Sequence, residues 1–130
     1  MLKNTQTITK HIPIQNDLDV IVARLRVREV AREIGFGTID QARISLAASE
    51  LARILTQILG QQGELVVSNI QANGHLGIEV TSVAHPRATT DIKPPDDKYC
   101  FSNVIALVDD GCVDTDQNQT TRVTLMKWLA

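Results

Sequence analysis

The sequence predicts an α+β fold, a two-layer sandwich with helices on one face of a mixed, largely antiparallel sheet. Two stretches with helical spacing of apolar residues, from Asp17 to Gly35 and from Ile39 to Gly60, follow one short strand pattern. A β-hairpin signal and a C-terminal strand pattern come after both helices, without the regular alternation of a parallel βαβ sheet. We expect one domain, because 130 residues is an ordinary domain size.

The first predicted strand lies at a sheet edge. Thr5 to Ile14 mixes β-branched and polar residues, and Pro13 has no N–H to donate to a neighbouring strand. Asp17 is placed to cap the next helix, whose apolar stripe is Val20, Ala23, Val27, Val30, Ala31 and Ile34. The other faces carry arginines that are typical of a solvated surface or of docking to an acidic partner: Arg24, Arg26, Arg28 and Arg32.

The second helix holds the acidic residue around which the chain is organised. Thr38 and Gln41 form a capping-box pattern, which predicts a helix that starts at Ile39 and ends at Gly60. Its predicted apolar side is Ile39, Leu46, Ala47, Ile54 and Ile58, with a second strip of Ile44, Ala48, Leu51 and Leu55. Glu50 falls in the middle of the first set. Spacing leaves two roles open for it: an ion pair with Arg43 or Arg53, or a base in a nucleotide pocket.

The C-terminal half begins with a hairpin. The predicted strands Glu64–Ile70 and His75–Val83 flank Asn73-Gly74, a type I′ turn signal because both turn residues need a positive φ. Gln61 to Gly63 is the predicted turn that leads into the first of them.

The remainder alternates between polar stretches and apolar ones. Ala84 to Tyr99 is predicted to be a long loop, and the apolar segment Cys100–Val108 is open between helix and strand. Asp109 to Gln119 is predicted to be a polar connection, and Thr120–Leu129 a sheet strand. Trp128 is expected to anchor that strand against the core.

Composition excludes several function classes. Thirteen basic and fifteen acidic residues give a net charge of −2, which does not favour nucleic acid or an acidic membrane surface as partner. No apolar run approaches the ~18 residues of a membrane span. Cys100 and Cys112 lack CxxC spacing, so we expect free thiols and a cytoplasmic location. No metal site is expected: His75 has no second ligand at metal spacing, and the acidic stretch lacks the glycine and terminal glutamate of a calcium loop.

One stretch resembles a known family. Val27 to Arg53, VREVAREIGFGTIDQARISLAASELAR, is similar to the corresponding stretch of the switch kinase of bacterial stress-response partner switching, a relative of the anti-sigma-factor serine kinases. The closing TTRVTLMKWL and the hairpin fall where that family has a strand and a hairpin. The resemblance implies the histidine-kinase-like ATPase fold of gyrase, Hsp90 and the histidine kinases, and a role in transcription regulation.

The resemblance also assigns the nucleotide-site positions. Glu50 matches the family's general base, and Ile54 stands where the family has the asparagine that holds magnesium. Ala84 stands where an aspartate reads the adenine amino group, and Pro86 and Ala88 stand at two glycine positions. The region of the family's glycine-rich phosphate loop contains no glycine. The resemblance therefore implies weak or no binding of ATP and Mg²⁺, and a vestigial Glu50.

Three functions follow as hypotheses. The first is a catalytically impaired kinase-like module that binds a STAS-type antagonist or another regulator, as a monomer or a homodimer. The second is an active serine/threonine kinase that takes its metal ligands from elsewhere: Asp91, Asp96 and Asp97. The third is a small-molecule sensor that uses the former pocket, lined by Ile54, Val83 and Ala84.

Overall fold

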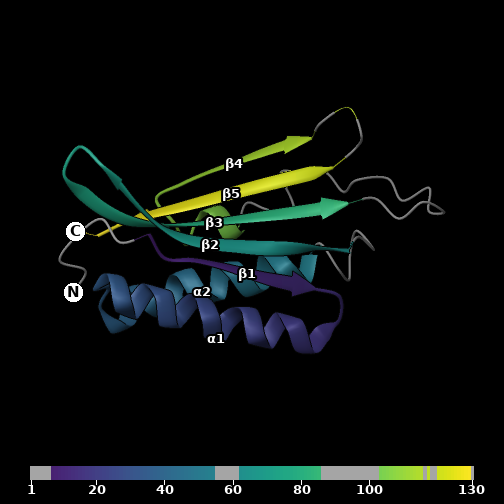
Figure 1. Ribbon diagram of the computed structural model, residues 1–130, viewed down its shortest axis with the longest axis horizontal. Coiled ribbons are helices and arrows are strands. Elements are labelled where there is room, and N and C mark those ends of the chain that lie inside the picture. The colour runs from purple at the N-terminus through teal and green to yellow at the C-terminus, as the bar shows by residue number, and fades with distance from the viewer. Residues whose placement is uncertain (1–6, 55–61, 86–102, 116, 118–119, 130) are drawn as a thin grey trace.

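The computed structural model describes residues 7–54, 62–85, 103–115, 117 and 120–129, and they form the predicted two-layer α+β sandwich. In Figure 1 two long helices lie side by side on one face of a five-stranded sheet. The elements in chain order are β1 (Thr9–Ile14), α1 (Asp17–Ile34), α2 (Thr38–Arg53), β2 (Gln62–Ala72), β3 (His75–His85), β4 (Asp110–Thr115) and β5 (Thr121–Trp128).

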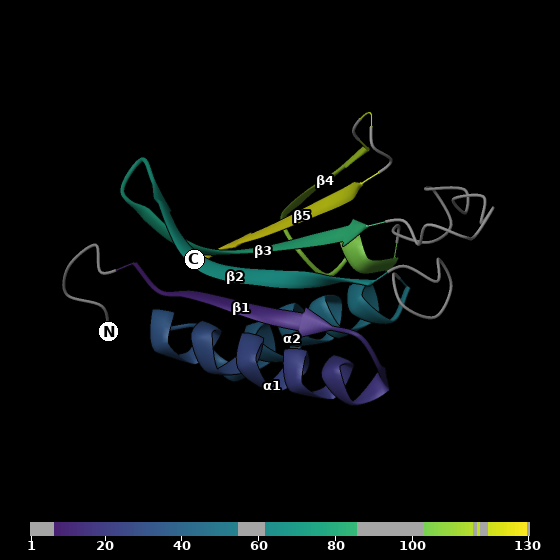
Figure 2. The same cartoon turned by 45° about the vertical axis from the view of Figure 1, so that its right-hand side comes forward.

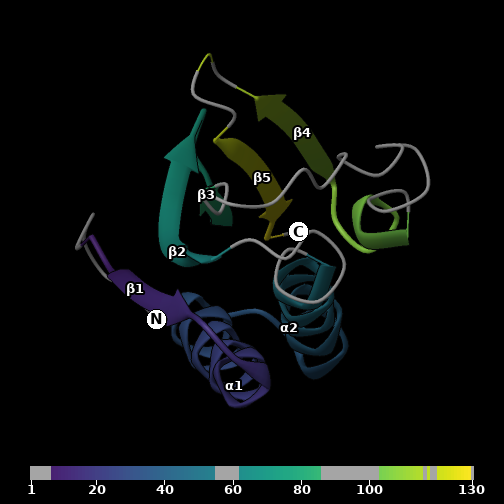
Figure 3. The same ribbon diagram turned by 90° about the vertical axis from the view of Figure 1, so that its right-hand side faces the viewer.

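The sheet has the strand order β1-β2-β3-β5-β4, and all four pairings are antiparallel. β1 is an edge strand, as Pro13 predicts, and pairs only with β2 among the described strands. The end-on view in Figure 3 shows α1 and α2 on the same side of the sheet. The helix-facing side chains of the sheet and the buried faces of the helices therefore form one core.

The predicted apolar stripe of α1 is confirmed, but its predicted cap is wrong. Ala23, Val27 and Ile34 are almost completely buried, as are the other stripe residues except Val20, which is partly buried. Asn16, not Asp17, is the N-cap: its Oδ1 accepts a hydrogen bond from the N–H of Asp19 at 3.0 Å. Asp17 is the first helical residue, where its charge complements the helix dipole.

The predicted capping box of α2 is also wrong. The helix begins at Thr38, one residue earlier than predicted, and its N-cap is Gly37, which has no side chain to make a cap hydrogen bond. The Gln41 amide does not reach back to Thr38 but donates from Nε2 to the backbone oxygen of Phe36 at 2.7 Å. The predicted end at Gly60 lies outside the described residues.

The buried side of α2 includes the described residues of the second predicted strip and half of those of the first set. Ile44, Ala48 and Leu51 are completely buried. From the first set, Ala47 and Ile54 are buried, whereas Ile39 is 70% exposed and Leu46 is 41% exposed. The reason is that α1 and the sheet contact adjacent sides of α2, which turns Ile39 and Leu46 toward solvent.

The β2–β3 hairpin is confirmed and longer than predicted. Its turn has φ of 52° at Asn73 and 80° at Gly74, the left-handed values that a type I′ turn needs, and Figure 2 shows it curling away from the helices. Residues 62 and 63, predicted to be a turn, already belong to β2, and the predicted loop start, Ala84, belongs to β3.

The prediction that Trp128 anchors β5 against the core is wrong. Trp128 pairs with Gly77 of β3 on the sheet face away from the helices, because its neighbour Lys127 occupies the buried face. A Cβ added to Gly77 would lie 2.7 Å from Cε3 of Trp128, so the indole ring lies directly over this glycine.

Two further predictions concern the segment before β5. The connection predicted over Asp109–Gln119 is in fact largely strand, since Asp110–Thr115 forms β4 at the other edge of the sheet. Within the segment left open between helix and strand, residues 103–105 are helical, and Val104 is buried in the core. Most of the predicted long loop, from residue 86 onward, lies outside the described residues.

The described helices do not include one that combines the length and apolarity needed to cross a lipid bilayer.

Candidate functional site

Glu50, the predicted base, lies near the C-terminal end of α2 and is held by an ion pair. Nη2 of Arg53 lies 2.8 Å from Oε2 of Glu50, and Nε of the same guanidinium donates to the same oxygen at 3.3 Å. The side chain of Glu50 is 38% exposed and that of Arg53 is 41% exposed. The Glu50 carboxylate raises the pKa of Arg53 above its ordinary value, chiefly by accepting these hydrogen bonds. Of the two partners that spacing allowed, Arg53 is the one that pairs, while Arg43 lies 3.7 Å from Asp40.

Ile54, at the position assigned to magnesium, lies one helical turn after Glu50 and belongs to the hydrophobic core. Only 4% of the residue is exposed. Its backbone remains helical, with φ −58° and ψ −45°, and its N–H points back to the carbonyl oxygens of Glu50 and Leu51. The chain thus places an aliphatic side chain, with no oxygen for a hard cation, next to the predicted base.

Ala84, at the position assigned to adenine recognition, is also a core residue. It is 1% exposed and lies in β3 between Gly63 of β2 and Thr121 of β5. Gly63 permits this close pairing, because a Cβ there would lie 1.9 Å from the backbone oxygen of Val83. The other two assigned positions, Pro86 and Ala88, lie outside the described residues.

The described residues around Ala84 leave little free space. They enclose a cavity of about 10 Å³, which is barely enough for one water molecule. It is lined by Ile14, Ala52, Gly63, Glu64, Ser82, Val83 and Ala84. Of the residues assigned to a small-molecule pocket, Val83 and Ala84 line this cavity, and Ile54 does not.

Comparison with known proteins identifies the family. No protein-family model matches the chain. The chain is similar to a curated protein of Bacillus subtilis (strain 168) named serine/threonine-protein kinase RsbT, with 31% identity over 127 residues. The match covers 91% of this chain and 95% of that protein. The chain belongs to the RsbT-like switch-kinase family. The predicted resemblance to the partner-switching serine/threonine switch kinases is therefore confirmed.

This switch-kinase family member has a second polar cluster that sequence reasoning missed, centred on Lys127. The Lys127 side chain is only 9% exposed, and its Nζ lies 3.7 Å from Oδ1 of Asp40 on α2 and 3.6 Å from Oδ1 of Asp109 before β4. Asp109 also accepts a hydrogen bond at Oδ2 from the N–H of Trp128 at 2.8 Å. These contacts tie the start of α2 to the edge of the sheet.

The alternation of residues along β5 could have predicted that Lys127 is buried. Thr121, Val123 and Leu125 occupy the buried face of β5, and Lys127 is the next residue with the same parity. A lysine at this position of an otherwise buried strand face needs carboxylate partners, and Asp40 and Asp109 supply them.

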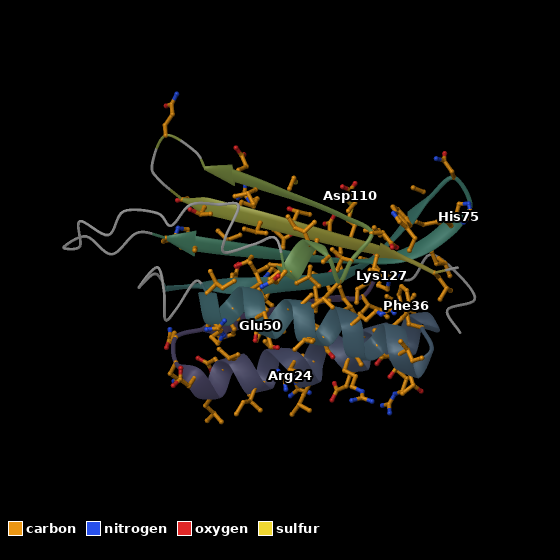
Figure 4. The ribbon with its side chains drawn as sticks, turned by 180° about the vertical axis from the view of Figure 1, so that it is seen from behind. Arg24, Phe36, Glu50, His75, Asp110 and Lys127 are labelled. Atoms are coloured by element: carbon orange, nitrogen blue, oxygen red, sulfur yellow. The ribbon has the colours of Figure 1, made fainter. Side chains whose placement is uncertain are left out.

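The Lys127 cluster borders an open pocket of about 730 Å³. Asp40 is ten residues before Glu50 along α2, about 15 Å at 1.5 Å per residue, and Figure 4 shows Lys127 and His75 toward one end of the molecule and Glu50 toward the other. The pocket lining is Asp40, Arg43, Ala72, Asn73, His75, Asp109, Lys127, Trp128 and Leu129. The lining of this pocket therefore includes none of the residues that the resemblance assigns to nucleotide binding.

Metal-binding side chains do not gather within the described part of the chain, where no group of three or more His, Cys, Asp or Glu could hold an ion. His75 is exposed at the hairpin turn, and Cys112 is an exposed free thiol on β4. Cys100 lies outside the described residues.

Proposed function

We propose that this chain is a catalytically impaired, cytoplasmic member of the switch-kinase family that acts by binding a protein, either a STAS-type antagonist or another regulator of partner switching. The observation that carries the proposal is the core position of Ile54 beside Glu50. Family membership supports the signalling role. The replaced nucleotide positions support the loss of catalysis.

The residues present do not fit Mg·ATP. An octahedral Mg²⁺ needs oxygen ligands, and at the family's magnesium position the chain offers a buried isoleucine. The adenine position offers a methyl group that is 1% exposed. Phosphoryl transfer depends on positioned charge around the phosphates. A half-exposed Glu50 paired with Arg53 does not supply that arrangement.

The second candidate function is an active serine/threonine kinase. Two observations favour it: the relative's name describes a serine/threonine-protein kinase, and Glu50 is exposed enough for a substrate hydroxyl to approach after Arg53 moves aside. Its suggested metal ligands, Asp91, Asp96 and Asp97, lie outside the described residues. The small-molecule sensor has less support, because the described part of its pocket encloses only about 10 Å³.

Co-expression of this chain with a STAS-domain antagonist protein of a partner-switching system tests the proposal. We expect a stable complex on size-exclusion chromatography, no phosphate on the STAS protein by intact-mass spectrometry after incubation with Mg·ATP, and equal complex formation by the Glu50→Gln variant. Absence of a complex would contradict the binding role. Phosphorylation that the Glu50→Gln variant loses would establish the kinase alternative instead.

A further inference from the structure

An apolar stripe on the outer face of α1 is exposed and is not covered by any other element that the structure describes. Leu18 is 66% exposed, and Ile21 and Leu25 are each 57% exposed. Their spacing of three and four residues places them within about 60° of one another around the helix, at about 100° per residue. Single exposed aliphatic residues are common on protein surfaces, but a line of three along one helix is typical of an interaction surface.

A ridge of arginines runs along α1 beside this stripe and beyond its C-terminal end, and only its first member, Arg24, is seen to contact α2. Arg24, Arg28 and Arg32 follow one another at four-residue intervals and are all exposed. Arg24 bridges the two helices, since its Nε and Nη2 donate to Oγ of Ser49 on α2 at 3.2 and 3.1 Å; Figure 4 shows Arg24 and Glu50 on these neighbouring helices.

The second and third arginines of the ridge, Arg28 and Arg32, are exposed to solvent. Across the part of the chain that the structure describes, no ion pair or side-chain hydrogen bond engages the guanidinium of Arg28 or Arg32. By contrast, Arg26, on another face of α1, lies 3.3 Å from Glu29. Like charges four residues apart on a helix destabilise it. Acidic groups from outside the fold would relieve this repulsion.

We propose that this face of α1 docks an amphipathic helix of a partner protein, with apolar residues against Leu18, Ile21 and Leu25 and acidic residues against the arginine ridge. The inference rests on the proposed protein-binding function and deepens it by naming the chemistry of the partner. Apolar contact supplies affinity in such helix docking, and the charge pairing sets the orientation and the choice of partner.

A second copy of this chain fits the surface less well. The exposed apolar residues of α2, Ile39 and Leu46, lie near Asp40 and Glu50. Both carboxylates are already paired within the chain, Asp40 with Arg43 and Lys127, and Glu50 with Arg53. Neither of these two carboxylates is therefore free to pair with the arginine ridge of a second copy.

The direct test uses two fluorescein-labelled amphipathic peptides that share one leucine face and differ only in their flank, which carries glutamates in one and lysines in the other. Fluorescence anisotropy at low salt should show that the glutamate peptide binds at least about tenfold more tightly, with a smaller difference at high salt. Equal affinity for the two peptides, or preference for the lysine peptide, would overturn the proposal.

Variants at exposed positions locate the binding surface. Ile21→Ser should weaken binding of the glutamate peptide at least about fivefold, whereas the matched control Ile39→Ser, on α2, should not. The double variant Arg28→Glu and Arg32→Glu should reverse the preference toward the lysine peptide, whereas Arg26→Glu should not. If a control variant weakened binding as much as its counterpart, the α1 surface would not be the site.

Two further measurements test whether the α1 face binds a second copy of the chain or a membrane instead. Sedimentation equilibrium that shows a wild-type dimer lost in Ile21→Ser would assign the face to self-association and overturn the proposal. Cosedimentation with phosphatidylglycerol vesicles that Ile21→Ser abolishes would assign it to a membrane, with the same consequence. If the chain binds the STAS protein but does not distinguish the two peptides, this inference is refuted and the proposed function stands. If the chain prefers the glutamate peptide but forms no complex with the STAS protein, the proposed function is refuted and this inference stands.

Discussion

Replacing Ile54 with asparagine, the residue that the resemblance implies at this position, tests whether the position belongs to the core. Ile54 is 4% exposed, and burying an isoleucine side chain contributes about 1.5–3 kcal/mol. A buried amide without a hydrogen-bond partner costs about 1–3 kcal/mol more. We therefore expect Ile54→Asn to lower the free energy of unfolding by about 4 kcal/mol, a large part of the 5–15 kcal/mol typical of a domain.

Urea unfolding followed by far-ultraviolet circular dichroism measures this loss, as a lower midpoint with an unchanged slope. The matched control is Ile39→Asn on the same helical segment, where the residue is 70% exposed. The control should change the free energy of unfolding by no more than about 0.5 kcal/mol, since isoleucine and asparagine have similar helix propensities. A loss below about 1 kcal/mol in Ile54→Asn, or a gain of Mg²⁺-dependent nucleotide binding, would refute the core assignment.

Two other substitutions test the packing around the site. Gly63→Ala should lower stability by at least about 1–3 kcal/mol, because the new Cβ would lie 1.9 Å from the backbone oxygen of Val83; thermal unfolding at an unchanged melting temperature would contradict the close strand pairing. Lys127→Met should cost about 1 kcal/mol, less than for a fully buried ion pair, because Asp40 and Asp109 are 35% and 44% exposed. Denaturant titration measures the cost, and a variant as stable as the wild type would show that the ammonium contributes nothing to the fold.

Local sequence signals predicted the layers of this fold well. Each of three features followed from a local signal: the stripe of α1 from helical periodicity, the Asn73-Gly74 turn from its residue types, and the edge strand from the missing N–H of Pro13. The order of these elements was sufficient for the α+β class. Spacing offered Arg43 and Arg53 as partners of Glu50, and the structure shows that Arg53 is the one that pairs.

The wrong predictions arose where tertiary contacts decide between local alternatives. Thr38 and Gln41 fit a capping box, yet Gln41 has a better partner in the carbonyl oxygen of Phe36. Ile39 and Leu46 fit an apolar stripe, yet α1 and the sheet cover other sides of α2. The acidic composition before β5 suggested a connection, whereas pairing with β5 makes it a strand.

The sequence named candidate site residues but did not predict what surrounds them in the fold. Family resemblance assigned Glu50, Ile54 and Ala84, and the structure shows that the last two are buried in the core. The Lys127 cluster joins residues from α2, β5 and the segment before β4. Because these segments are far apart in the chain, their proximity becomes visible only in the folded molecule.

Calorimetric titration of the purified chain with Mg·ATP tests the central claim most directly, namely that this family scaffold has lost its nucleotide site. We predict no saturable heat and no rise in the unfolding temperature at millimolar Mg·ATP. A ligand present at 100 times its dissociation constant would stabilise the fold by about 2.7 kcal/mol. Saturable, Mg²⁺-dependent binding with a stabilisation of that size would contradict the account.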